Sequence, residues 1–220
     1  MIRISLLTAF ILFITACSMQ PQSTSPSVLS SANWQQHQQR IAQLQDWKLS
    51  GKLGFRAPQQ GGSAALNWTQ EKNNYQLLLS GPFGVGNAKI VGDDETAEML
   101  YGDTVYRQPP MQLAMQLTGL PLPVDALSWW ARGLPSPNQP AATALTTGAD
   151  GLAVGFDQAG WQLSFSRYRQ TDAGRLPGKI TGSHNAATNS TDINGTETNS
   201  TGEDISYSFK LVISGWKFLE

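Results

Sequence analysis

The sequence has few of the residues on which catalytic and metal sites depend. Its 220 residues include one cysteine and two histidines, only 14% are charged, and the net charge is −1. Neither His37 nor His184 has a cysteine or carboxylate at the spacing of a metal site or a catalytic triad, and no nucleophile elbow or phosphate-binding glycine loop occurs. The small net charge argues against a surface that follows nucleic-acid phosphates. We therefore expect that the protein is not an enzyme and that it binds no metal ion and no cofactor.

A hydrophobic run long enough to span a bilayer is also missing. Arg3 precedes a largely apolar stretch from Ile4 to Ile14, which is too short to cross and is typical of a signal peptide. It ends in Ile14-Thr15-Ala16-Cys17, which resembles the bacterial lipobox. An ordinary secretory signal with a stray cysteine is the alternative. Because Cys17 has no possible disulfide partner, we expect a signal peptide over 1–16 and a lipid anchor at Cys17. In bacterial lipoproteins Ser18, in place of the Asp that retains them, implies the outer membrane.

The first part of the mature chain is predicted to be a tether. Residues 17–32 are rich in Ser, Pro, Gln and Thr, a composition typical of a flexible linker. Asn33 is a candidate N-cap for a helix to Leu44, in which Trp34 and Ile41 share one apolar stripe. We therefore place the folded domain at residues 33–220.

From Trp47 onward the apolar residues recur with a period of two, which indicates strands. Turns every ~8–12 residues predict an antiparallel meander that forms a sandwich or barrel. The run Asp93-Asp94-Glu95 suits a hairpin turn better than a calcium site. Leu176 to Ile180 is expected to be an edge strand because it contains Pro177. Residues 183–204, rich in Asn, Thr, Ser and Gly, are expected to be a disordered insertion.

Two apolar helices are predicted in the middle of the chain. Pro110 starts the first, which ends before Gly119, and Val124 to Arg132 forms the second, which stops at Gly133. Both should lie against the sheet. Their Met and Trp side chains suit either ordinary core or an adaptable binding lining. The same pattern describes a filled barrel and one that encloses a cavity.

The stretch Ser80 to Ile90 joins two predicted strands through a turn with an aromatic residue at its tip. Pro82, Phe83 and Gly84 suit a type I turn. Loop tips are normally polar and solvated, so Phe83 either folds back onto the core or stands out as an apolar probe for a membrane or partner.

Several segments together resemble the LolB family, and the likeness spans nearly the whole chain. The segments are the lipobox, the helix start at 33–39, the strand and loop at 75–84, Leu117-Thr118-Gly119-Leu120-Pro121-Leu122-Pro123, Trp130 with Gly133-Leu134-Pro135, and Lys210-Leu211-Val212-Ile213-Ser214-Gly215-Trp216. The 183–204 insertion departs from the family pattern, where a short hairpin is expected, and leaves the last strand pairing open.

The resemblance implies a mainly β fold with a few helices. It is a single, incomplete antiparallel β-barrel of about ten to eleven strands, with a helical lid over an apolar cavity. The family is an outer-membrane receptor that faces the periplasm, accepts lipoproteins from the carrier LolA and places them in the inner leaflet of the outer membrane. The expected partners are therefore a LolA-type carrier, acylated lipoproteins and outer-membrane lipid, with the chain acting as a monomer.

The resemblance also assigns sites. The family's protruding loop has a Leu at its tip, and Phe83 matches it, so Pro82, Phe83 and Gly84 are the implied membrane-insertion loop. Inward-facing apolar residues are candidates for the acyl-chain cavity, although each is equally compatible with ordinary core. They are Leu49, Leu53, Phe55, Leu66, Trp68, Leu77, Leu79, Ile90, Leu117, Leu120, Leu127, Trp130, Trp161, Leu163, Phe165, Leu211 and Ile213.

Two other functions fit the same sequence features. A structural or assembly lipoprotein could bind an outer-membrane protein through its sheet edge and the Phe83 loop. A hydrolase of apolar ligands is a third possibility, but it lacks a recognisable nucleophile and base.

Overall fold

The computed structural model describes residues 26–81, 87–186 and 205–219. Cys17 and the loop residues Pro82, Phe83 and Gly84 lie outside the described residues, so the predictions made for them remain predictions. The elements are α1 (Pro26–Ala42), β1 (Asp46–Arg56), β2 (Gly61–Glu71), β3 (Asn74–Ser80), β4 (Ala88–Gly92), β5 (Ala97–Tyr101), β6 (Thr104–Gln108), α2 (Pro110–Thr118), α3 (Val124–Ala131), β7 (Thr143–Thr147), β8 (Ala153–Gln158), β9 (Trp161–Ser166), β10 (Arg169–Thr171), β11 (Gly174–Leu176), β12 (Lys179–Ala186) and β13 (Ile205–Phe218).

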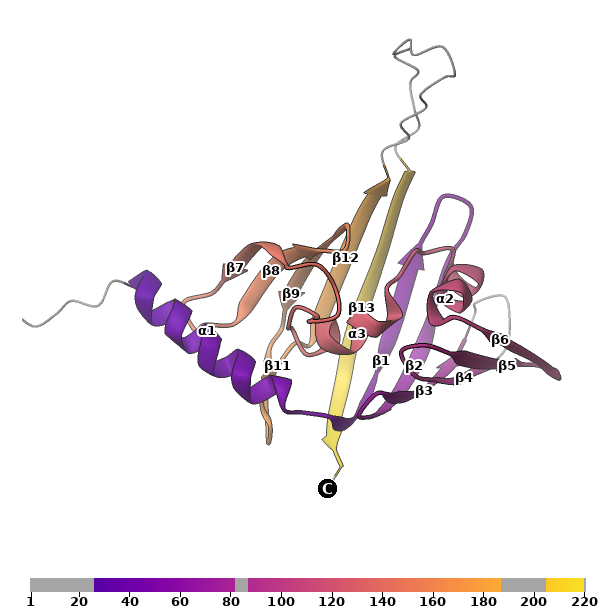
Figure 1. Ribbon diagram of the computed structural model, residues 1–220, viewed down its shortest axis with the longest axis horizontal. Coiled ribbons are helices and arrows are strands. Elements are labelled where there is room, and N and C mark those ends of the chain that lie inside the picture. Colours follow the sequence, from indigo (N-terminus) through magenta and orange to yellow (C-terminus); the bar gives the residue numbers. More distant parts are fainter. Residues whose placement is uncertain (1–25, 82–86, 187–204, 220) are drawn as a thin grey trace, which may run out of the picture.

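One antiparallel sheet forms the body of the molecule. Its 11 strands follow the order β6-β5-β4-β3-β2-β1-β13-β12-β9-β8-β7, and β10 pairs with β11 in a separate hairpin. The sheet curves strongly around one side, where α2 and α3 lie (Figure 1). Because β6 and β7 end the order without pairing to each other, the barrel is open. The predicted open antiparallel barrel with a helical lid is confirmed.

The long strands β1 and β13 place apolar side chains in rows on the concave face. Leu53 pairs with Leu211, which in turn pairs with Ile180 of β12. A bulge between Ser50 and Gly51 shifts the register of β1. Gly51 is needed there, because a Cβ at this position would lie 2.4 Å from the Val212 carbonyl oxygen. The alternation seen in the sequence therefore becomes one continuous apolar inner face.

The lid helices form where the sequence predicts them. Pro110 occupies the first turn of α2, where its missing N–H leaves no helical hydrogen bond unmade. Gly119 ends α2 with φ +67°, and its N–H donates to the Met115 carbonyl. Both helices cover the concave side of the sheet (Figure 1). None of the helices in the described ranges has both the length and the apolarity to cross a bilayer.

Three predicted boundaries differ in the structure. Helix α1 begins at Pro26 rather than Asn33, so residues 26–32 are helical and not tether. The cause is Trp34 and Ile41, which are buried and fix a helix that then extends toward its N-terminus. Strand β12 lies between β13 and β9 and is not an edge strand, because Pro177 precedes its ladder. It also continues to Ala186, so 183–186 belong to a strand rather than to the insertion.

Candidate apolar cavity

An apolar cavity lies between the concave face of the sheet and the lid helices. Strands β1 to β5, β12 and β13 form its floor and walls, and α2 and α3 form its roof. The cavity encloses about 100 Å³. Its lining residues are Leu53, Leu66, Trp68, Tyr75, Leu77, Leu79, Ile90, Ala97, Pro110, Leu113, Ala114, Leu117, Thr118, Leu122, Val124, Leu127, Trp130, Ala131, Ile180, Phe209 and Leu211.

The indole N–H groups of the two lining tryptophans are bonded to glutamine side chains. Trp68 Nε1 donates to Gln70 Oε1 at 2.9 Å, and Gln70 Nε2 donates to the Lys72 carbonyl at 2.8 Å. Trp130 Nε1 donates to Gln158 Oε1 at 2.8 Å, and Gln158 in turn bonds the backbone at Ser136. Both rings therefore offer hydrocarbon to the cavity, because their polar atoms are already satisfied.

The hydroxyl groups in the lining are likewise suited to a dry site. Thr118 Oγ1 donates to the Ala114 carbonyl at 2.6 Å and accepts from the Leu120 N–H at 3.2 Å, so it needs no water. Burial, with smaller contributions from Asp93 and Asp94, raises the pKa of Tyr75, which keeps its side chain neutral. A cavity lined by uncharged and mainly apolar side chains favours hydrocarbon over water.

A buried cation fastens one end of the lid. Arg132 follows α3, and its guanidinium donates to the carbonyls of Ile41 (3.2 Å), Leu44 (2.6 Å) and Ser128 (3.0 Å). Its Cζ also lies 4.4 Å from the centre of the Trp129 ring. Burial lowers the pKa of Arg132 to about 10, so it remains charged at neutral pH. Arg132 thus joins α3 to the turn between α1 and β1.

Ten of the predicted cavity residues line this cavity. They are Leu53, Leu66, Trp68, Leu77, Leu79, Ile90, Leu117, Leu127, Trp130 and Leu211.

The other seven predicted residues lie elsewhere. Leu49, Leu120, Trp161, Leu163, Phe165 and Ile213 are buried in solid core, and Phe55 packs against the edge of that core. The half of the sheet around β8 and β9 is filled by aromatic rings. The rings of Phe156 and Phe165 lie 5.0 Å apart, and those of Trp161 and Phe209 lie 5.3 Å apart. The barrel is therefore hollow on one side and filled on the other.

The sequence interpretation missed several lining residues on the lid. Leu113, Ala114 and Val124 lie on the faces of α2 and α3 that point to the sheet, and Leu113 is buried. Their helical spacing relative to Leu117 and Leu127 is the signal that could have found them. Ile180 was missed because its strand was placed at the sheet edge. In the described ranges no three His, Cys, Asp or Glu side chains are grouped to hold a metal ion.

An open antiparallel sheet with a helical lid over an apolar cavity defines an incomplete β-barrel. A LolA superfamily protein from Nitrosomonas europaea superposes with a TM-score of 0.50 at 8% identity, covering 85% of this chain and 94% of that chain. A DUF1329 family protein from Desulfovibrio piger gives a TM-score of 0.50 at 9% identity, covering 89% and 94%. At these identities the likeness concerns the fold alone.

Sequence comparison gives the family. The family described as outer membrane lipoprotein LolB matches residues 45–216. The outer-membrane lipoprotein LolB of Cellvibrio japonicus is 38% identical over 184 residues, covering 79% of this chain and 88% of the relative. That of Ectopseudomonas mendocina is 39% identical over 151 residues, covering 68% and 73%. This chain belongs to the LolB family of outer-membrane lipoproteins. Membership of this family supports a role in lipoprotein localization at the outer membrane.

Proposed function

We propose that this protein receives lipoproteins from a LolA-type periplasmic carrier and inserts them into the inner leaflet of the outer membrane. The cavity under α2 and α3 holds the acyl chains of the cargo. Cys17 anchors the protein to the outer membrane by its lipid, with the domain on the periplasmic side. The observation that carries this proposal is the cavity itself, which is lined mainly by apolar side chains and whose tryptophan and threonine polar atoms are bonded to other groups of the protein.

Acyl chains need such a site because water penalises them strongly. Each methylene group exposed to water costs ~0.8 kcal/mol, so a single long chain costs on the order of 10 kcal/mol. Passing the chains from one apolar cavity directly to another avoids this cost. Spontaneous transfer also requires that the receiving cavity bind the chains more tightly than the donor does.

The space inside the cavity is small in this structure. Its volume of about 100 Å³ is well below the ~300–1,000 Å³ typical of ligand pockets. Binding an acyl chain therefore requires α2 and α3 to move away from the sheet. The segment from Gly119 to Pro123 joins the helices, and both line the cavity mainly through apolar side chains. Because Arg132 in addition bonds the end of α3 to Ile41 and Leu44, α2 is the part of the lid that can separate more easily.

A variant that reduces the space in the cavity tests the proposal. The unanchored chain, carrying Cys17→Ala, is mixed with carrier loaded with a lipoprotein, and the cargo that copurifies with it is identified by mass spectrometry. We expect transfer to this chain. Ala114→Phe adds a ring to the cavity roof and should reduce acceptance about tenfold, which corresponds to about 1.4 kcal/mol.

The matched control is Ala65→Phe, because Ala65 is exposed on the outer face of β2. This control should accept cargo like the parent. Equal acceptance by the Ala114 and Ala65 variants, with both shown to be folded by circular dichroism, would contradict the cavity as the binding site. Failure of the unanchored parent to accept any cargo would instead count against an autonomous transfer domain.

A further inference from the structure

The exposed apolar side chains of this protein are concentrated on the outer face of β3 to β6. Among the described residues, eight large hydrophobic side chains are exposed, and four of them lie on this face: Leu78 (41%), Val91 (44%), Leu100 (45%) and Val105 (59%). Strand register places Leu78 beside Lys89, Lys89 beside Leu100, and Leu100 beside Val105. They form one row across four strands, on the side opposite the cavity. Val91 lies on the same face in the neighbouring row, opposite Glu98. We call Leu78, Lys89, Leu100 and Val105, together with Val91, the outer apolar row.

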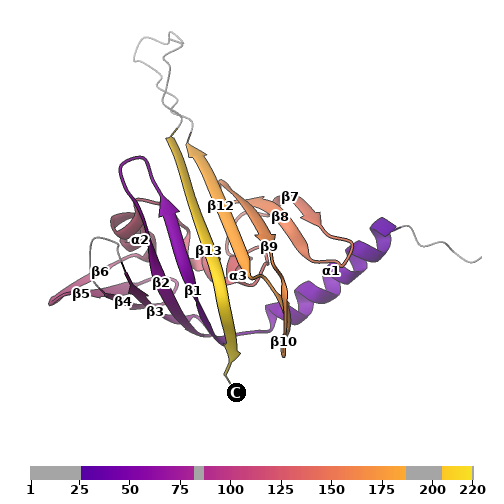
Figure 2. The same ribbon diagram turned by 180° about the vertical axis from the view of Figure 1, so that it is seen from behind.

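The same outer face is basic on the two central strands. Lys48, Lys52 and Arg56 of β1 and Lys210 and Lys217 of β13 are all exposed there, between inward-facing apolar residues. They make no ion pair with any residue that the structure describes. We call these five residues the basic strip. Figure 2 shows this side of the sheet, with α2 and α3 behind it.

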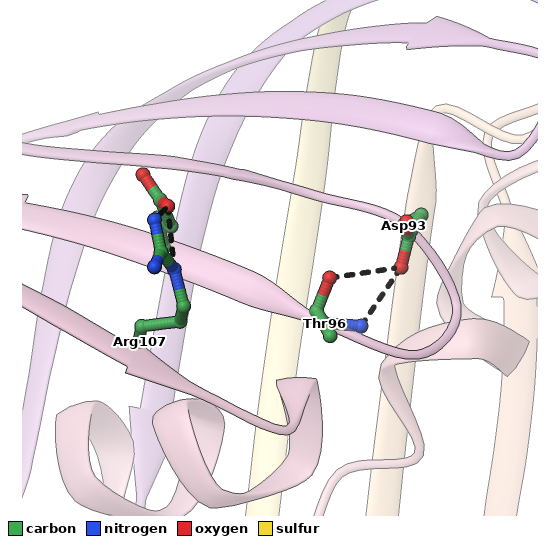
Figure 3. A network of polar contacts seen from close by, with 4 residues as sticks. Asp93, Thr96 and Arg107 are labelled. Atoms are coloured by element: carbon green, nitrogen blue, oxygen red, sulfur yellow. Dashed lines mark hydrogen bonds and ion pairs between the residues drawn. The ribbon is translucent and has the colours of Figure 1, made fainter.

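Two charges of the basic strip are placed where they repel each other. Lys48 and Lys217 are directly opposite in the β1–β13 ladder. Like charges in a cross-strand pair destabilise a sheet. Three carboxylates on β1 to β6 share this face. Glu98 is already paired with Arg107 across β5 and β6 (Arg107 is labelled in Figure 3), and Asp46 and Glu71 lie opposite each other, one on either strand next to the Lys48–Thr69 pair. An anionic partner on this face would relieve the repulsion.

We propose that this outer face, made of the outer apolar row and the basic strip, rests on the surface of an anionic lipid bilayer. Cations that reach phosphates beside aliphatic side chains that enter the headgroup boundary are the chemistry of a peripheral membrane surface. Lys89 shows the combination within one row, since its stem lies between two leucines while its ammonium can extend to a phosphate. The outer apolar row argues against an acidic polypeptide, which would match only the basic strip.

This inference goes beyond the proposed function, because it concerns how the domain lies on the membrane and needs no cargo. When the outer face lies on the membrane, the lid is on the opposite side of the sheet and points away from the lipid. The lid then remains free to meet a carrier.

The test uses the chain from residue 17 with Cys17→Ala, which contains no other cysteine. It is mixed with vesicles of phosphatidylethanolamine and phosphatidylglycerol, and with vesicles of phosphatidylcholine alone. We expect binding to the anionic vesicles that weakens at high salt, as screened charges require. Lys48→Gln with Lys217→Gln should weaken this binding about tenfold and should not lower the unfolding midpoint, because a repulsive pair is removed.

A label locates the surface directly. Leu100→Cys and, as a control, Val154→Cys are each labelled with an environment-sensitive fluorophore; both side chains are exposed, and Val154 lies on β8 outside the outer apolar row. On anionic vesicles, the emission of the label at position 100 should report an apolar environment. The emission of the label at position 154 should still report an aqueous one. This result can be read even if the chain also touches the membrane through residues near Phe83.

Several results would overturn the proposal. They are absence of binding to anionic vesicles, an aqueous environment of the label at position 100 when the protein is bound, and unchanged binding by the Lys48/Lys217 variant. Binding to polyglutamate but not to vesicles would show that the face takes an acidic polypeptide instead. A chain that passes these tests but accepts no cargo would leave the membrane surface established and refute the transfer function separately.

Discussion

At the scale of single residues, the shape of the cavity depends on the ring of Phe209, which packs directly against Gly182. Phe209 of β13 pairs directly with Gly182 of β12, and its ring lines the cavity. A Cβ built on Gly182 would lie 2.2 Å from Phe209 Cε1. No side chain fits there unless the ring moves.

Gly182→Ala is therefore expected to displace Phe209 and to lower the free energy of unfolding by about 1–3 kcal/mol, the range for overpacked cores. Urea denaturation followed by tryptophan fluorescence measures the loss. Gly215→Ala is the control, because a Cβ at Gly215 meets nothing within 4 Å; it should change stability by less than about 0.5 kcal/mol. Equal effects from both substitutions would show that the contact with Phe209 is not the cause.

The residues of the inner face could be predicted from alternation, but the cavity could not. Leu53 and Leu211 line the cavity, whereas Leu163 and Phe165 lie in solid core, although all four alternate with polar neighbours in the same way. A row of inward side chains meets either another row or empty space. Which of the two it meets depends on the side-chain volumes of the facing walls and on the distance between those walls. Those volumes are set by strand order and lid position, and neither is present in a local pattern.

At the scale of elements, Arg132 determines which part of the lid is fixed. Two of its backbone hydrogen bonds, to Ile41 and Leu44, join α3 to the end of α1 and the turn before β1, and the third, to Ser128, stays within α3. Helix α2 instead meets the sheet mainly through apolar side chains. The lid therefore has one helix, α3, that is fixed by buried hydrogen bonds, and one, α2, that is held mainly by hydrophobic contact.

Arg132→Met should release the fastened helix. It removes charge-assisted hydrogen bonds and leaves buried carbonyls unpaired, so we expect a loss of about 2–4 kcal/mol in the free energy of unfolding. Hydrogen exchange should speed up in α3 and at the C-terminal turn of α1. Arg169→Met is the control, since exposed Arg169 donates to the Ser214 carbonyl at the surface. Unchanged exchange in α3 would mean that Arg132 does not hold the lid.

Elements with strong local stop signals could be predicted, and elements defined by tertiary packing could not. Pro110 and Gly119 delimit α2, which forms as predicted. The first turns of α1 have a linker-like composition and are helical only because the helix continues from packed residues farther along. Strand β7 (Thr143–Thr147) is almost wholly exposed, and its sequence does not alternate between apolar and polar residues. It is therefore recognisable as a strand through its pairing with β8 and not from its sequence.

At the scale of the whole molecule, cargo acceptance and membrane insertion should involve different parts of the chain. The cavity lies on the concave face of the sheet, and the outer apolar row lies on the opposite face. The resemblance to the LolB family predicts that Pro82, Phe83 and Gly84, between β3 and β4 in the sequence, enter the bilayer. A substitution at the tip should therefore affect insertion without affecting acceptance.

Phe83→Glu separates the two steps. A carboxylate at the level of the hydrocarbon costs about 3 kcal/mol, so insertion of cargo into vesicles should fall on the order of a hundredfold. Transfer from loaded carrier to the unanchored variant should stay at the parent level, because the variant keeps its cavity. Phe83→Leu restores an apolar tip and should insert normally. If Phe83→Glu delivers cargo to vesicles as fast as Phe83→Leu, the loop has no part in release, and the outer apolar row becomes the remaining apolar contact with the membrane.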